Sequence, residues 1–225
     1  MKQQSIKSAC HSLFSLKPSA RHTLLWACVM LLLSACSRPQ ASIAIQPLGQ
    51  VPQVHIDSMQ TALEKAYACP VYRLSEKALP SSAFVHIKSP RYRADSLLKH
   101  LLTLKPDSIG YIIGITGKDI STTKRGRDGK VKEPAAKYRD WGIFGLGYRP
   151  GRACIVSSFR LKNTDQKSFY DRLQKVSIHE IGHNKGLRHC PNEGCVMADA
   201  AETIKTVDKV SKRLCEKCAG RVVGH

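Results

Sequence analysis

The sequence lacks internal repeats, low-complexity tracts and any apolar run long enough to cross a membrane as a helix. The first two absences exclude a repeat architecture, and an apolar content of 42% argues against a disordered chain. The longest apolar run, Leu24–Leu33, has ten residues, whereas a membrane-spanning helix needs about 20. The 225 residues therefore suffice for one compact domain and are too few for two comfortable ones.

Acidic residues are scarce, since 36 Lys+Arg stand against 17 Asp+Glu, and residues 1–22 contain no acid at all. The apolar run that follows suits the hydrophobic region of a secretory signal. It ends in LSAC at residues 33–36. This resembles a bacterial lipobox, in which small residues precede a cysteine that is acylated after cleavage. The alternatives are a short membrane-anchor helix, or an ordinary signal in which Cys36 stands by chance.

We therefore expect a lipoprotein signal peptide at residues 1–35, a tether at 36–41 and a single domain at 42–225. On this expectation the protein is exported and anchored to the bacterial cell envelope membrane by a lipid on Cys36. Removing residues 1–35 lowers the net charge from +19 to +15, because four basic residues and no acidic residue are lost. Such a charge favours acidic partners, anionic envelope surfaces or simple solubility, and it decides nothing about the fold.

The apolar pattern of the domain predicts alternating strands and helices. We expect strands at 42–48, 69–74, 108–116 and 152–161, helices at 51–68 and 92–104, a helix from about 164 to the motif below, and a last helix at 206–218. We expect a loop at 80–90 and an exposed, mobile loop at 117–140, where basic residues are frequent and apolar residues few. This order indicates a small α/β sheet packed with helices.

Residues 179–197 read HEIGHNKGLRHCPNEGCVM and contain the first candidate metal site. His179 and His183 are four apart on a predicted helix, so their imidazoles share one face and can bind one zinc. Glu180 between them can reach a water on that zinc, as in the HExxH hydrolases. Gly186 can turn the chain, which brings His189 back as a third ligand and leaves one position open for water. The alternative is a set of ordinary histidines on a polar helix face.

Cysteines form a second candidate metal site. Cys190, Cys195, Cys215 and Cys218 have the spacing C-x4-C-x19-C-x2-C. Two close pairs of thiolates are typical of a closed, structural zinc site. The alternative is disulfide bonding, because lipidation implies export to an oxidising space. Cys69 and Cys154 remain, either as a disulfide or as two separate thiols.

Several stretches of the chain resemble the archaemetzincins, over roughly residues 42–220. HEIGHNKGLRHC and PNEGCVM match that family's signature HExxHxxGx3Cx4CxM, and CEKC follows Met197 after the seventeen residues that the signature requires. Upstream, the similar stretches are RYRAD at 91–95, GKDIST at 117–122, DWGIFGLGYRPG at 140–151 and VSSFRL at 156–161.

The resemblance implies a zincin-like metzincin fold, with a mixed twisted sheet, an active-site helix and a C-terminal helix tied by the four-cysteine zinc site. It also implies that Met197 is the Met-turn residue, a hydrophobic floor beneath the histidine site. A strand near 142–147 would form the rim of the cleft, where an extended peptide pairs by β-augmentation. The chain departs from the family in its lipobox and in Asn184 and Lys185, which we expect to face solvent.

We therefore expect a monomeric zinc-dependent peptidase with two Zn²⁺, one catalytic and one structural. The catalytic zinc would activate a water, and Glu180 would take the proton of this water as general base and pass it to the leaving amine. The alternatives are a hydrolase of non-peptide amides in the cell envelope, or a weakly active or inactive zinc-binding module for acidic partners. We expect no nucleic acid partner, because the protein is expected to be exported and the basic segment 118–139 has few aromatic residues for base stacking.

Overall fold

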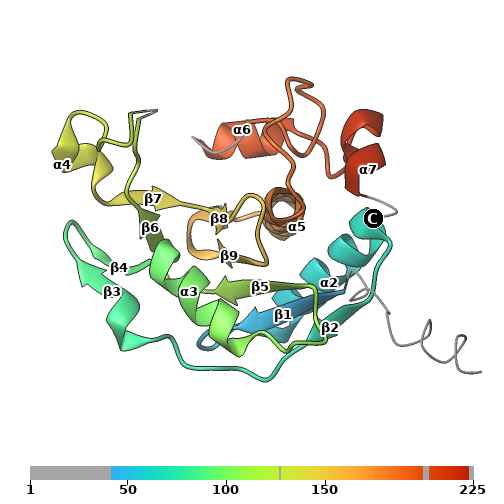
Figure 1. The fold of residues 1–225 in the computed structure, drawn as a ribbon, viewed down its shortest axis with the longest axis horizontal. Coiled ribbons are helices and arrows are strands. Elements are labelled where there is room, and N and C mark those ends of the chain that lie inside the picture. The colour runs from blue at the N-terminus through green and yellow to red at the C-terminus, as the bar shows by residue number, and fades with distance from the viewer. Residues whose placement is uncertain (1–41, 127, 200–202, 223–225) are drawn as a thin grey trace, which may run out of the picture. The chain divides into compact units, whose positions relative to one another are not determined.

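The computed structural model describes residues 42–126, 128–199 and 203–222 (Figure 1). The expected signal peptide, the tether and the acylated Cys36 lie outside these residues. Within the described ranges, no helix combines the length and apolar character that a membrane span requires.

A five-stranded sheet forms the centre of the domain, in the order β2-β1-β5-β9-β8. Its strands are β1 (Ile43–Pro47), β2 (Val71–Arg73), β5 (Tyr111–Thr116), β8 (Gly145–Gly147) and β9 (Ala153–Ser157). Strands β1, β2, β5 and β9 run parallel, whereas β8 pairs antiparallel with β9 at one edge of the sheet. Strands β1, β5 and β9 are buried along almost their whole length, which explains their continuous apolar runs. The predicted small mixed sheet is confirmed.

Helices cover both faces of this sheet. Helix α3 (Ala94–Leu104) lies on one face, where its Leu101 and Ile155 of β9 both pack over Gly114. The neighbouring residue Cys154 points to the opposite face, because successive strand side chains alternate. There it lies beside Gly147 and the helix α5 (Gln166–Asn184), which packs against α2 (Gln53–Tyr67).

A second sheet of four short strands was not predicted. Its order is β3-β4-β6-β7, with β3 (Phe84–His86), β4 (Pro90–Arg93), β6 (Ile120–Thr122) and β7 (Trp141–Ile143). The expected loops at 80–90 and 117–140 are therefore wrong in part. The first also holds a 3-10 turn at Ser81–Ala83, and the second also holds the helix α4 (Ala135–Tyr138). Strands of three or four residues carry too few apolar positions to give a recognisable alternation.

The ends of helices were predicted unevenly. Helix α5 begins after Asp165, whose carboxylate accepts the backbone amides of Lys167 and Ser168, and the αL turn at Gly186 (φ +90°) follows its end as expected. The predicted helix at 206–218 is wrong, because α6 (Ile204–Lys209) and α7 (Glu216–Val222) are separate. The chain between them bends at residues 210, 212 and 213, and the Arg213 carbonyl accepts the amide of Val196. The strand predicted at 152–161 ends in a 3-10 turn at Phe159–Leu161.

Candidate metal centres and catalytic cleft

Three histidines come together at the end of α5. His179 and His183 lie on one face of the helix, and their ring centroids are 4.5 Å apart. After the turn at Gly186, His189 returns to ring-centroid distances of 5.3 and 5.0 Å from the other two. The ligand atoms of the three imidazoles all lie within 4.8 Å of one another. The sequence spacing therefore produces the expected cluster.

The second nitrogen of each ring has its own partner. Nδ1 of His179 donates to the Val196 carbonyl and Nδ1 of His183 donates to the Leu187 carbonyl, each over 2.8 Å. Carbonyl oxygens only accept, so Nδ1 carries the proton and Nε2 is left to bind a metal. Nδ1 of His189 lies 3.5 Å from a carboxylate oxygen of Asp199. The two hydrogen bonds fix the tautomers of His179 and His183 that a zinc site requires.

Burial also favours the form of imidazole that binds metals. It lowers the pKa of His179 to about 3, with His183 as a further cause, and it lowers the pKa of His183 as well. Both rings are therefore neutral at physiological pH, and a neutral imidazole is the ligand form. The donor set and its protonation fit a zinc ion.

Glu180 is buried between α5 and β8. A Cβ placed at Gly145 would lie 2.7 Å from its Oε1, and one at Gly147 would lie 2.8 Å from its backbone oxygen. Leu146 points to the opposite face of the sheet. The sequence GLG thus allows β8 to approach α5 so closely that no side chain fits between them. Burial raises the pKa of Glu180 to about 8.

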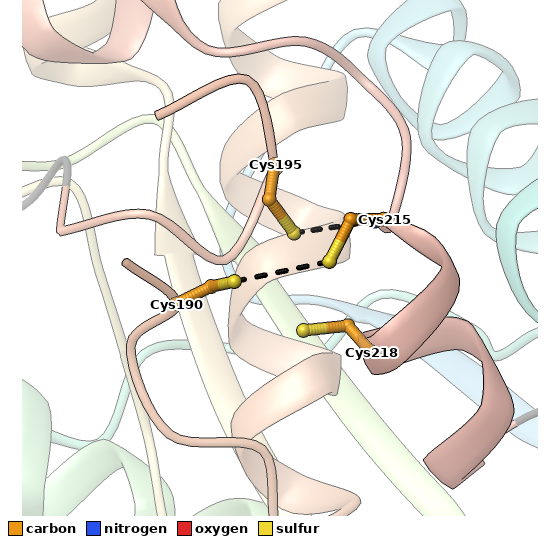
Figure 2. A group of neighbouring side chains, drawn as sticks. All are labelled: Cys190, Cys195, Cys215 and Cys218. Carbon is orange, nitrogen blue, oxygen red and sulfur yellow. Dashed lines mark hydrogen bonds between the residues drawn. The ribbon is translucent and has the colours of Figure 1, made fainter. Parts of the chain in front are cut away.

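The four cysteines form the second cluster (Figure 2). Cys190 and Cys195 come from the segment after α5, Cys215 directly precedes α7 and Cys218 lies in its first turn. The Sγ atoms of all four lie within 4.8 Å of one another. The Sγ atoms of Cys190 and Cys215 are 3.8 Å apart, and a tetrahedral site with Zn–S bonds of about 2.3 Å has S–S edges of about 3.8 Å. All four are free thiols. The donor set fits a closed zinc site better than disulfides.

Cys69 and Cys154 are also free thiols, half-buried and buried respectively. Burial raises the pKa of both. Of the two alternatives left open by the sequence, the structure has separate thiols.

One tripeptide connects the two clusters. Cys195 belongs to the thiol cluster, and the Val196 carbonyl accepts the hydrogen bond from His179. Met197 packs against α5 so closely that a Cβ placed at Gly182 would lie 2.3 Å from the Sδ atom of Met197. Met197 is fully buried, as a hydrophobic floor must be. The amide of Cys190 donates to the Met197 carbonyl, which closes this loop.

The expectation that Asn184 and Lys185 face solvent is wrong. Asn184 is buried, and its Nδ2 donates to the carbonyls of Tyr148 and Ala153 over 2.9 Å each. Lys185 is half-buried, with its ammonium 5.6 Å from the Tyr67 ring and 5.2 Å from that of Tyr111. Asn184 thus ties the end of α5 to the connection between β8 and β9.

An apolar pocket opens beside His179 and Glu180. It is lined mainly by Ile143, Phe144, Val176, Val196, Val207 and Val210. Lys175 also lines it, but the ammonium is paired with Asp171 at 2.6 Å and with the Asp208 carbonyl at 3.1 Å. Sequence reasoning did not predict this pocket. No motif could have shown it, because its walls come from β7, α5, α6 and the segments around them.

Three imidazoles with free Nε2 atoms, a buried carboxylate and an adjoining apolar pocket define a metal-dependent hydrolase of the HExxH class. The profile of peptidase family M54 matches residues 70–223. Archaemetzincin of Haloquadratum walsbyi is 32% identical over 185 residues, which cover 78% of this chain and 96% of that protein. The chain therefore belongs to peptidase family M54, the archaemetzincins.

Solved structures agree with this assignment. The crystal structure of archaemetzincin from Methanopyrus kandleri superposes with a TM-score of 0.66 at 25% identity, covering 83% of this chain and 96% of that one. A zinc-dependent peptidase from Methanocorpusculum labreanum gives a TM-score of 0.63 at 26% identity, covering 80% and 99%. The predicted zincin-like fold is confirmed, and the protein is a zinc metallopeptidase whose family implies a peptide or protein substrate.

Proposed function

We propose that this chain hydrolyses peptide bonds with one zinc held by His179, His183 and His189 and with Glu180 as general base. The observation that carries the proposal is the convergence of three imidazoles beside one buried carboxylate, with Nδ1 of His179 and of His183 hydrogen-bonded to backbone carbonyls. When bound, the zinc would lower the pKa of the attacking water to about 7 and polarise the scissile carbonyl. Glu180 then accepts the proton of that water and passes it to the leaving amine.

The burial of Glu180 supports this role. Burial raises the pKa of Glu180 to about 8, whereas the charge of a bound zinc would favour the carboxylate form that accepts the proton of the water. Its contact with Gly145 fixes the carboxylate at the edge of the sheet, where a bound substrate would lie.

The edge of β8 supports an extended peptide as substrate. The Phe144 carbonyl accepts the amide of Ser157, and the amide of Tyr148 donates to Ala153, so these residues face β9. Because an antiparallel ladder alternates, the backbone groups of Gly145 and Gly147 point away from β9, toward the open edge. A peptide that pairs with this edge would place one side chain in the apolar pocket. Both features favour a peptide over a non-peptide amide or a binding module without activity.

We further propose a second, structural zinc on Cys190, Cys195, Cys215 and Cys218. The 3.8 Å separation of two Sγ atoms and the closed arrangement support it. Each cluster is formed within one chain, so a monomer suffices for activity. We also propose export through residues 1–35, a tether at 36–41 and lipid attachment at Cys36, which the lipobox-like LSAC supports.

Digestion of a peptide library tests the hydrolytic proposal. Glu180→Gln keeps the shape of the side chain but removes the base, so we expect turnover to fall by about 10²- to 10⁴-fold. Zinc content, measured on the same sample, should stay unchanged, because Glu180 is not proposed as a ligand. Glu193→Gln, at an exposed glutamate of the segment between the first two cysteines, is the matched control and should keep full turnover. Equal turnover by Glu180→Gln and the wild type would rule out this mechanism.

A further inference from the structure

A buried ion cluster joins four segments that are distant in the sequence. The guanidinium of Arg91 donates to the carboxylate of Asp119 over 2.8 Å and to that of Asp140 over 3.1 Å. The guanidinium of Arg160 forms a bidentate pair with Asp119, through Nε at 2.6 Å and through Nη2 at 2.8 Å. Arg91 also donates to the Asp140 backbone carbonyl. Each of the four upstream stretches that resemble the archaemetzincins contributes one member, although no role follows from the stretches themselves.

The cluster is balanced and largely shielded from water. The side chains of Asp119 and Asp140 are 6% and 0% exposed, that of Arg91 is 13% exposed, and that of Arg160 is 32% exposed. Two cations therefore meet two anions. Loss of one partner from such a buried group leaves a charge without compensation, so the members hold one another in a single arrangement.

Arg160 also lies directly against the backbone of β7. A Cβ placed at Gly142 would lie 2.2 Å from the Cζ atom of Arg160, so only glycine admits the guanidinium there. Asp140, the residue before β7, is held by Arg91 at the same time. The start of β7 is thus fixed on two sides by the ion cluster.

Strand β7 ends at the apolar pocket beside His179 and Glu180. Figure 1 shows β7 and β8 following one another toward α5. Ile143 and Phe144 form part of the wall of the apolar pocket, and Gly145 touches Glu180. Only two residues, Ile143 and Phe144, separate Gly142, where Arg160 lies, from Gly145, which meets the proposed general base.

We propose that Arg160 is a positioning residue for peptide hydrolysis. Through Asp119 and the backbone at Gly142 it holds β7, and β7 places the pocket wall and the edge of β8 relative to Glu180. The inference rests on the proposed function. In the described part of the chain no hydrogen bond or ion pair links Arg160 to the metal ligands or to Glu180, so its role is to hold the surface on which the substrate binds.

Kinetics of Arg160→Ala and Arg160→Lys test the proposal on peptides that differ only in the apolar residue next to the scissile bond. Lysine keeps the charge but cannot reproduce the bidentate hydrogen bonding to Asp119. We expect KM to rise about tenfold or more in both variants, with kcat changed far less, because an interaction common to ground state and transition state is lost. The ratio of kcat/KM between the peptide with a large apolar residue and the peptide with a small one should fall toward one. Arg152→Ala, at an exposed arginine before β9, should match the wild type.

Two further measurements separate positioning from a general loss of structure. Methylguanidinium should restore KM in Arg160→Ala, since the native side chain is one-third exposed and its site is within reach of solvent. In Arg160→Ala, amide hydrogen exchange should accelerate at residues 141–145 and stay unchanged in α5. The zinc content of this variant should equal that of the wild type. Unchanged KM, or a fall in kcat that follows loss of zinc or of α5 protection, would overturn the proposal. An inactive wild type would instead contradict the proposed function, while exchange at 141–145 still tests whether Arg160 holds β7.

Discussion

The clustering of the candidate site residues was predictable because their sequence pattern is local. Two histidines four apart on a helix must share a face, and a glycine after the helix allows the chain to return. The structure accordingly brings His179, His183 and His189 together, with Glu180 buried beside them. Asn184 shows the limit of such reasoning. Its partners are backbone carbonyls of the β8–β9 connection, and no side-chain pattern in the sequence marks a carbonyl as an acceptor.

The glycines of β8 lead to a prediction at the scale of single atoms. In Gly145→Ala the new methyl group meets the side chain of Glu180 at 2.7 Å, whereas in Gly147→Ala it meets the backbone oxygen of Glu180 at 2.8 Å. The side chain can swing away, but the helix backbone cannot. We expect Gly145→Ala to lower kcat by roughly 10²-fold with little change in melting temperature, since a displacement of about 1 Å has such effects.

Gly147→Ala should instead destabilise the fold by about 1–3 kcal/mol, as overpacking does. Thermal unfolding and single-turnover kinetics of both variants distinguish the two effects. Gly220→Ala is the control, because the space around Gly220 in α7 is open and alanine favours a helix. The explanation fails if Gly145→Ala loses stability without losing kcat.

The longer elements were predictable. Of the short strands, only β2 and the pair β7 and β8 fall where strands were expected, at 69–74 and near 142–147. Strands β1, β5 and β9 and helices α2, α3 and α5 carry enough apolar residues for their period to be recognised. Strands β3, β4, β6 and β7 have three or four residues. Strands β3 and β4 form a local antiparallel pair, but the pairing of β6 with β4 and β7 joins segments that are farther apart in the sequence. Ile120 of β6 is fully buried in what the basic composition indicated to be an exposed loop. The division of 206–218 into two helices likewise depends on the hydrogen bond between Val196 and Arg213, which is a tertiary contact.

The loop Cys195–Met197 predicts that the two metal clusters are coupled. The Val196 carbonyl orients His179, while the Val196 amide is held by Arg213, two residues before Cys215. Cys215→Ser should loosen this loop, and partners that orient a metal-binding histidine typically account for 10- to 100-fold in metal affinity. We therefore expect zinc at the histidine site to be lost to a chelator at about 10- to 100-fold lower concentration.

Metal content during chelator titration measures this effect without any assay of turnover. Cys69→Ser is the control, because Cys69 is a free thiol outside the cluster. Coupling is refuted if Cys215→Ser loses only the zinc of the cysteine cluster and the histidine site keeps the affinity of the wild type.

For the whole molecule, the N-terminal segment and the catalytic domain imply different surroundings. A domain with four free thiols in contact distance is best preserved where thiols stay reduced or bind metal, whereas the lipobox-like LSAC predicts export. The proposed zinc on the cysteines would reconcile the two, since thiolates that coordinate a metal do not form disulfides. The net charge of +15 that the proposed cleavage would leave also suits a protein held close to an anionic membrane.

Lipid anchoring gives the last prediction. Cells that express the chain should incorporate labelled palmitate into it and retain it in the membrane fraction, because Cys36 follows small residues at the expected cleavage site. Cys36→Ala should abolish the label and shift the band to the mass of the uncleaved chain. Cys28→Ala, within the apolar run, should keep both label and processing, which separates acylation at the lipobox from modification of any nearby cysteine. Equal labelling of Cys36→Ala and the wild type would show that the chain reaches its compartment without a lipid on this residue. Its basic surface would then be the remaining candidate for membrane contact, and high salt would release such a protein, whereas a lipid anchor would hold it.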